Sequence, residues 1–219
     1  MKSDIISSAL AMFVSQDRHR QSLRRPFFVD GVGYASDGRC AIRVKRAEGF
    51  DESQNHANFP ITALKNYFEN PGEVNEVSAK AHEIHAAAFM AIANCYQFAT
   101  DEDPAEDEED IDEGIVSSYE LVSNRAFVNF DGVRFSAIYL KKAIDVIRIC
   151  SDNCDLISVK MKKPEDKYSG TILILECGDV SIIIMSCRPA RLDGEEIMEA
   201  HSEVTSDGVW IHRVTEDLR

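Results

Sequence analysis

The chain has 219 residues, of which 44% are hydrophobic and 28% charged, and its formal net charge is −14. This composition is that of a globular protein long enough to bury a core, and the longest apolar stretches, such as residues 182–185, are too short to cross a bilayer. A charge of −14, taken over the whole chain, argues against nucleic acid as a ligand.

The first fifty residues are predicted to form one helix followed by about three strands. Residues 4–15 place apolar side chains on one helical face, and Ser3 is expected to cap the helix. Residues 27–45 are rich in Phe, Val, Tyr and Ile. They are interrupted by Asp30-Gly31 and Asp37-Gly38, which favour tight turns between antiparallel strands.

The middle of the chain is predicted to be a helical and acidic insertion. A short helix is expected over residues 60–70, begun by Pro60. An alanine-rich helix is expected over residues 74–99. Residues 101–113 hold ten acidic side chains and no basic one, so we expect them to form an extended acidic loop.

The β pattern returns after residue 116. Strands are predicted at 118–123 and 126–130, and Ser136 is expected to cap a helix over residues 137–150. Further strands are predicted at residues 157–161, 171–177, 180–187 and, in the C-terminal extension, 209–214. Gly178-Asp179 is a hairpin signal, and the run Ser181–Met185 is apolar on both faces, which predicts a central position in the sheet.

Two separated stretches resemble parts of a bacterial polymerase III β clamp domain. Arg25-Pro26-Phe27-Phe28 and residues 32–42 are similar to the start of such a domain, where an Arg-Pro pair leads through strands to an Ala-Thr-Asp-Gly-His-Arg-Leu-like turn. Residues 135–147 resemble the clamp helix, and residues 157–161 and 171–176 resemble the strands after it. Residues 183–188 are similar to a Met-Pro-x-Arg ending, with Ser186 in the place of the proline.

The resemblance implies an α+β, DNA-clamp-like fold with two pseudo-repeated helix-plus-strands units, whose helices pack side by side. The units would be residues 1–50 and 116–190, with the helical and acidic insertion at 51–115 and an extension at 191–219. Together they would make a single clamp-like domain over residues 1–219. Bacterial clamp subunits carry three such domains, whereas this chain has sequence for only one. A ring of six domains would therefore need six copies of this chain.

Clamps hold DNA through Lys and Arg side chains on their inner helices, which neutralise phosphates without reading bases. The resemblance therefore implies these DNA-facing candidates: Arg18, Arg20, Arg24, Arg25, Lys141, Lys142 and Arg148. Residues 1–50 carry +4 and residues 126–190 carry +1, whereas residues 51–125 carry −14 and residues 191–219 carry −5. The alternative is that these cations are ordinary solvated side chains.

The sequence offers no catalytic signature. A nucleophile elbow, a phosphate loop and a dinucleotide fingerprint are all absent, so we expect no enzymatic activity and no cofactor. His82 and His85, three residues apart on the predicted helix, are weak candidates for a metal site without a third ligand. Six cysteines, mostly in apolar surroundings, are typical of reduced thiols in a cytoplasmic protein.

Three functions remain open at this stage. The first is a clamp-fold protein of DNA replication, with duplex DNA, other copies of itself as a homo-oligomer, or replication proteins as partners, and no membrane. The second is a protein-interaction or regulatory module of phage or mobile-element type that does not bind DNA. The third is a small metal-dependent enzyme that uses His82 and His85.

Overall fold

The computed structural model describes residues 3–47, 49–70, 74–101, 126–130, 132–151, 154–162, 170–187, 199–204 and 210–215. The chain forms two compact units, one of Met1–Ile84 with Lys142–Ser186 and the other of His85–Lys141 with Cys187–Arg219. None of the described helices combines the length and the apolar character that a membrane span requires.

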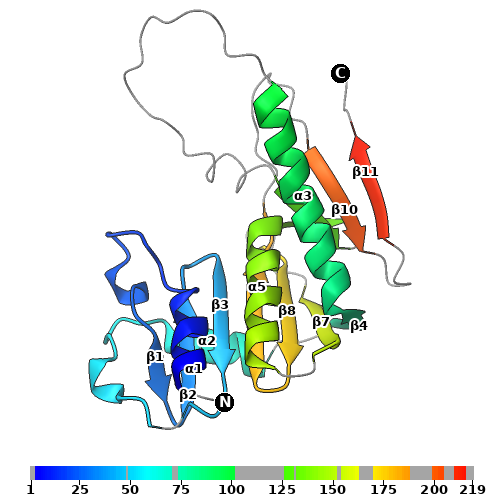
Figure 1. Cartoon of the computed structure of the whole chain (residues 1–219). Helices are drawn as coiled ribbons and strands as arrows, with labels where there is room; N and C mark the ends of the chain where they lie inside the picture. Colours follow the sequence, from blue (N-terminus) through cyan, green and yellow to red (C-terminus); the bar gives the residue numbers. More distant parts are fainter. Residues whose placement is uncertain are drawn as a thin grey trace, which may run out of the picture. The chain divides into compact units, whose positions relative to one another are not determined.

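A seven-stranded antiparallel sheet forms the centre of the first unit (Figure 1). Its order is β1 (Phe27–Val29), β2 (Val32–Ser36), β3 (Cys40–Val44), β9 (Val180–Met185), β8 (Ile172–Cys177), β7 (Leu156–Lys162) and β4 (Asn75–Lys80). The apolar strand β9 lies in the middle of this order. The prediction that the run Ser181–Met185 is central is therefore confirmed.

Two meanders of three strands join in this sheet. Helix α1 (Ser3–Ala11) precedes β1, β2 and β3, and helix α5 (Ala137–Cys150) precedes β7, β8 and β9. The meanders meet where β3 pairs antiparallel with β9, so that Ile42 lies opposite Ile182. In the chain order, each of these meanders thus follows a helix.

The predicted turns between these strands are confirmed by the backbone. Asp30 and Gly31 both have positive φ angles, of 53° and 71°, as the hairpin between β1 and β2 requires. Gly38, between β2 and β3, has a φ of 91°, and Gly178, between β8 and β9, has a φ of 57°.

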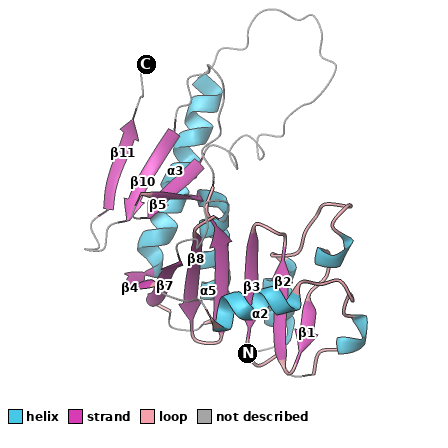
Figure 2. Cartoon of the chain, turned by 180° about the vertical axis from the view of Figure 1, so that it is seen from behind, coloured by secondary structure: helices cyan, strands magenta, loops and turns pink. Residues whose placement is uncertain are grey.

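Helices cover both faces of the sheet. On one face α1 buries Ile6 and Leu10, and a side chain added at Gly33 on β2 would meet Leu10 at 2.7 Å, so the helix lies directly against the strand. On the other face α2 (Ile61–Glu69) buries Leu64 and Phe68 in a cluster with Tyr34, Ala41, Ile172, Ile174 and Ile183 (Figure 2). The core is therefore two apolar layers, one on each side of the sheet.

A polar network lies beside the α2 cluster. The side chain of Arg43 is largely buried; its Nη2 lies 2.9 Å from Ser181 Oγ and 3.6 Å from Glu176 Oε1. Lys160 Nζ lies 2.6 Å from Glu176 Oε2. Burial acts to raise the pKa of Glu176. The hydrogen bond and the charge of Lys160, together with the hydrogen bond from Ser181 and the charge of Arg43, hold the pKa below its usual value.

The second unit contains a four-stranded sheet in the order β11 (Trp210–Thr215), β10 (Glu199–Val204), β5 (Ala126–Phe130) and β6 (Val133–Ser136). Strand β10 is parallel to β5, and the other pairs are antiparallel. The strands predicted at 126–130 and 209–214 are confirmed, whereas β10 was not predicted. The strand predicted at 118–123, and all of the acidic segment 101–113 except Asp101, lie outside the described residues.

Three local predictions are wrong. Residues 75–80 form strand β4, and helix α3 (Ala81–Asp101) begins only after it. In β4 the exposed Glu76, Ser78 and Lys80 alternate with half-buried Val77 and Ala79, a period of two that the alanine-rich context obscured. The first helix ends at Ala11, four residues earlier than predicted. Ser136 is the last residue of β6 and does not cap α5, because its buried Oγ has no hydrogen-bond partner.

The cysteines also differ from the expectation of reduced thiols. Cys154 and Cys177 form a disulfide, with Cα atoms 6.4 Å apart, at the open end of the hairpin of β7 and β8. Among the residues that the structure describes, Cys40 and Cys150 are free thiols.

Candidate nucleic-acid interface

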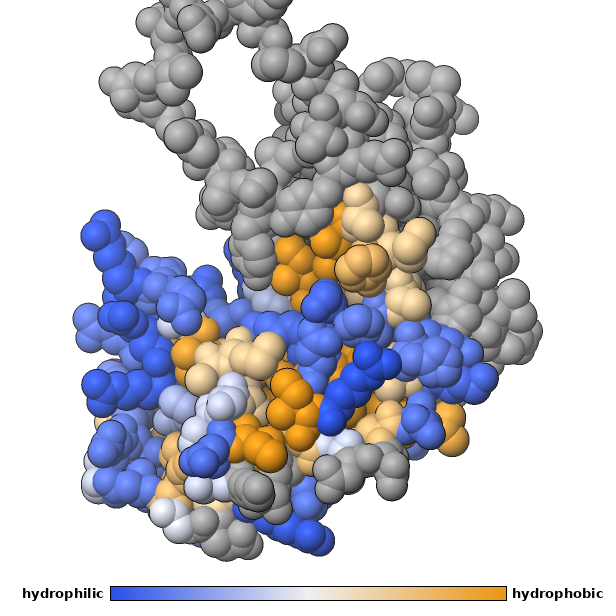
Figure 3. Space-filling model, viewed as in Figure 1, coloured by the Kyte–Doolittle hydropathy of each residue, from blue (hydrophilic) through white to orange (hydrophobic). Residues whose placement is uncertain are grey.

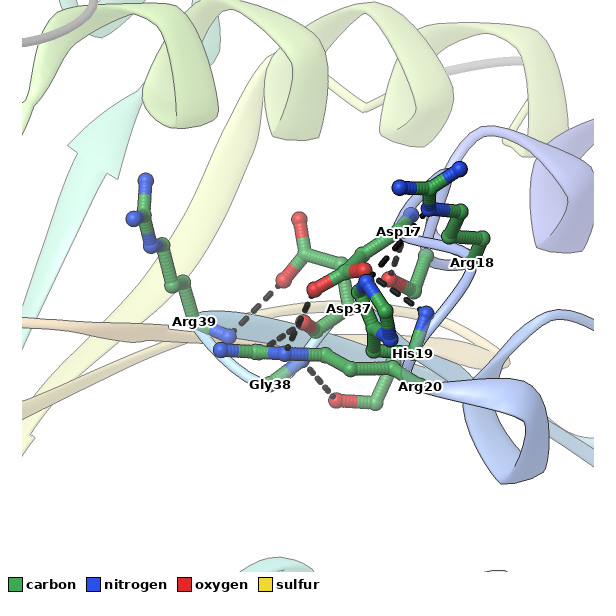
Figure 4. Close-up of polar contacts among 9 residues, drawn as sticks. Asp17, Arg18, His19, Arg20, Asp37, Gly38 and Arg39 are labelled. Carbon is green, nitrogen blue, oxygen red and sulfur yellow. Dashed lines mark hydrogen bonds and ion pairs between the residues drawn. The ribbon is translucent and has the colours of Figure 1, made fainter.

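The loop after α1 meets the turn between β2 and β3 (Figure 4). Arg20 connects the two segments. Its Nη1 donates a 2.7 Å hydrogen bond to the backbone oxygen of Asp37, and its Nε lies 3.6 Å from Asp17 Oδ2 in its own loop. Residues that are seventeen positions apart in the chain are therefore held together by one guanidinium group.

The carboxylates of Asp17 and Asp37 both accept hydrogen bonds within their own turns. Asp37 Oδ1 accepts hydrogen bonds from the backbone N–H groups of Arg39 and Cys40, at 2.8 and 2.9 Å. Asp17 Oδ1 accepts one from the N–H of His19 at 2.8 Å. Such Asx turns fix the backbone of both segments. The two acids are thus satisfied locally, and they neutralise the nearby cations only in part.

Gly38 is required at the crossing point for two reasons. Its φ of 91° lies in the region that residues with a Cβ rarely adopt. A Cβ at this position would also collide with Nη1 of Arg20. The Asp-Gly pair that predicted the turn therefore also leaves the space in which the arginine lies.

Lys142 of α5 lies against the same region. Its Nζ is 4.5 Å from the centroid of the Phe13 ring, just beyond the end of α1, in a cation–π contact. Burial raises the pKa of the neighbouring Cys40 thiol well above its usual value, and the charge of Asp37 raises it further, while that of Lys142 lowers it. The thiol therefore stays protonated and is no candidate nucleophile.

The structure separates the seven predicted cations into two groups. Arg20, Lys141 and Lys142 are engaged in contacts with protein groups, and Lys141 belongs to the second unit. The other four of the seven, Arg18, Arg24, Arg25 and Arg148, have exposed side chains that form no ion pair with any described residue. Of these, Arg18 makes one side-chain contact, from its Nε to His19 Nε2 at 3.4 Å.

Sequence analysis missed Arg39. Its side chain is exposed, and its guanidinium makes no hydrogen bond or ion pair with the part of the chain that the structure describes. The sequence did contain a signal, because Arg39 directly follows the predicted Asp37-Gly38 turn, and turns lie at the surface. Figure 3 shows the face that carries α1, where hydrophobic residues reach the surface among hydrophilic ones; Met12, at 39% exposure, is one of the exposed large hydrophobic residues.

The histidines give no support to a metal site. His82 is exposed on the first turn of α3, and His85 is half-buried and engaged in a contact. Within the described ranges, no three His, Cys, Asp or Glu side chains lie close enough to hold a metal ion. No observation therefore favours the metal-dependent enzyme.

Comparisons with known proteins give similarity at the level of fold alone. No protein-family model matches the chain, and no curated protein is significantly similar in sequence. The crystal structure of the Helicobacter pylori beta clamp bound to a DNA ligase peptide is similar with a TM-score of 0.46 and 11% identity, over 84% of this chain and 62% of the clamp chain. The chain thus spans less than two thirds of that clamp. It is a mixed protein of helices and mainly antiparallel sheets with a clamp-like structural neighbour, and at this TM-score the likeness is no guide to function.

Proposed function

We propose that the chain is a non-enzymatic, clamp-fold scaffold that binds duplex DNA in replication, with residues 1–50 and 116–190 as the halves of one domain. The observation that carries the proposal is the joining of two helix-plus-meander segments through β3 and β9. The part of α5 that belongs to the first unit begins at Lys142. The Nζ of Lys142 lies over the ring of Phe13, which follows α1 closely in the chain, so this part of α5 lies beside the end of α1.

The charges on this unit support DNA as the ligand. Arg18, Arg24, Arg25 and Arg148 are exposed, and the structure gives them no carboxylate partner among the described residues. Guanidinium groups of this kind bind phosphate oxygens and release the counterions of the duplex. The negative charge of the chain lies mostly in residues 51–125 and 191–219, whereas residues 1–50 and 126–190, which hold these arginines, carry a small positive charge.

Assembly is part of the proposal, because one domain cannot encircle a duplex. The sheet of the first unit ends in β1 on one side and β4 on the other. An edge strand offers unpaired backbone groups to a second chain. We propose that further copies of the chain or replication proteins complete the assembly.

DNA binding is tested by fluorescence anisotropy of a labelled duplex over a range of salt concentrations. The wild-type protein is expected to bind at low salt and to release the DNA as salt rises, and Arg24→Ala/Arg25→Ala should bind more weakly. Lys65→Ala is the matched control, since Lys65 lies on α2, on the opposite face of the sheet, where it pairs with Asp30. Absence of binding by the wild-type protein at low salt would overturn the proposal. The native mass, measured in parallel, gives the number of copies in the assembly.

The second candidate is an interaction module without DNA. The net charge of −14 favours it, because a chain of this charge repels the duplex at long range. A monomer that binds no DNA at low salt would support this candidate over the first.

A further inference from the structure

We infer that Arg39 is a further phosphate contact of the proposed DNA surface, that it acts together with Arg18, and that Arg20 is the positioning residue that holds the two in place. The inference rests on the proposed function, since it names residues of the same surface. The sequence predicted Arg18 as a DNA-facing cation, but it indicated neither the role of Arg39 nor the positioning role of Arg20.

Arg39 presents its charge from a fixed backbone. Its N–H donates to Asp37 Oδ1 at 2.8 Å, and its backbone oxygen accepts from the N–H of Met185 at 3.0 Å. Both backbone groups are therefore committed, while the guanidinium is exposed and makes no contact with the described residues. A cation on a fixed backbone loses less conformational entropy on binding than one on a mobile segment.

Arg18 lies across the junction from Arg39. In Figure 4 the two side chains extend to the same side of the junction, whereas Arg20 lies flat over the turn. The loop of Arg18 is fixed by the hydrogen bond from the His19 N–H to Asp17 Oδ1. Two guanidinium groups that emerge on one side of a rigid junction suit a run of phosphates on one strand.

Two of the three guanidinium nitrogens of Arg20 already face protein oxygens. Its Nη1 is used by the oxygen of Asp37 and its Nε faces Asp17. Its separated donor groups reach both segments at once, which the single ammonium of a lysine does not reproduce. The missing Cβ of Gly38 leaves room for this arginine against the turn. Arg20 therefore acts on DNA through the placement of Arg18 and Arg39.

The experiment is duplex anisotropy with the full chain and the variants Arg39→Ala, Arg18→Ala, Arg20→Ala and Arg20→Lys, with Arg24→Ala/Arg25→Ala and Lys65→Ala alongside. Loss of one exposed phosphate contact should weaken binding about fivefold and reduce the slope of log K against log salt by about 1. We expect this of Arg39→Ala and of Arg18→Ala, and no change for Lys65→Ala. Thermal melting of each variant checks that its fold is intact.

Arg20→Lys separates the two roles of Arg20, because it keeps the charge and removes the two-point contact. If Arg20 is a positioning residue, Arg20→Lys weakens binding as much as Arg20→Ala does. Full binding by Arg20→Lys together with weak binding by Arg20→Ala would show a direct phosphate contact and overturn the positioning role. If Arg24→Ala/Arg25→Ala weakens binding and Arg39→Ala does not, the inference fails and the proposed function stands. If the wild-type protein binds no DNA, the proposed function fails.

Discussion

The disulfide between Cys154 and Cys177 should carry a measurable part of the stability of the first unit. It closes a loop with a sequence separation of 23 around the hairpin of β7 and β8. In the chain-entropy description, a cross-link over a loop of this length removes about 11 cal/mol/K of entropy from the unfolded state, or about 3 kcal/mol at 25 °C. Reduction, or the variant Cys154→Ser/Cys177→Ser, is expected to lower the free energy of unfolding by this amount.

The assay is denaturant unfolding followed by circular dichroism, with and without a phosphine reductant. The wild-type protein should lose about 3 kcal/mol in reductant, whereas Cys154→Ser/Cys177→Ser should be insensitive to it. Cys150→Ser is the matched control, because Cys150 is a free thiol and burial raises its pKa to about 11, which leaves it a poor nucleophile for disulfide exchange. An equal free energy of unfolding for the oxidised and the reduced wild-type protein would refute the reasoning.

Three further predictions concern the same unit. Ile184→Ala, at a fully buried position of β9, should lower the free energy of unfolding by about 3 kcal/mol in urea; an effect under about 1 kcal/mol would contradict the assigned core. Because the folded pKa of Glu176 lies below its usual value of 4.5, its contribution is present above that pH and lost as the pH falls through the folded value. Acid titration of stability should therefore be flatter in Glu176→Gln than in the wild-type protein. Gly38→Ala, at a φ of 91°, should cost about 1–2 kcal/mol by denaturant unfolding, and a neutral result would show that the turn relaxes.

Much of the first unit was predictable because its signals are local. The pairs Asp30-Gly31 and Gly178-Asp179 set the turns through backbone conformations that few other residues adopt. The continuous apolar run of β9 required burial on both faces, and the structure places that strand in the middle of the sheet. In these segments the local preference and the tertiary environment favour the same structure.

The wrong predictions concern residues whose structure depends on partners far away in the sequence. Strand β4 is formed by pairing with β7, more than seventy residues away, so that Val77 lies opposite Val159. The strand is followed directly by the alanine-rich helix α3, so the local sequence favoured one continuous helix over both segments. The role of Arg20 could not be predicted either, because its carbonyl partner, Asp37, is brought near only when the loop after α1 reaches the turn. From the sequence, Arg20 is a cation like its neighbours. Only the structure shows that its guanidinium is already bound to Asp37 and Asp17.

The location of the free cations limits how strongly one copy of the chain can hold DNA. Helix α1 carries no basic residue in its last turn, and the unpaired arginines next to it lie in the loop and the turn beyond it. If Arg18, Arg24, Arg25, Arg39 and Arg148 all reach phosphates, the slope of log K against log salt would be about −4 to −5. Five contacts supply only a modest affinity, which at this slope falls about 500-fold between 50 and 200 mM salt. A single copy would therefore be a poor DNA-binding protein at physiological ionic strength. Stable retention would then require several copies on one duplex, since linked sites multiply their affinities. A closed assembly should stay on circular DNA at salt concentrations that release it from linear DNA, whereas an open chain of copies should leave both forms at the same salt concentration.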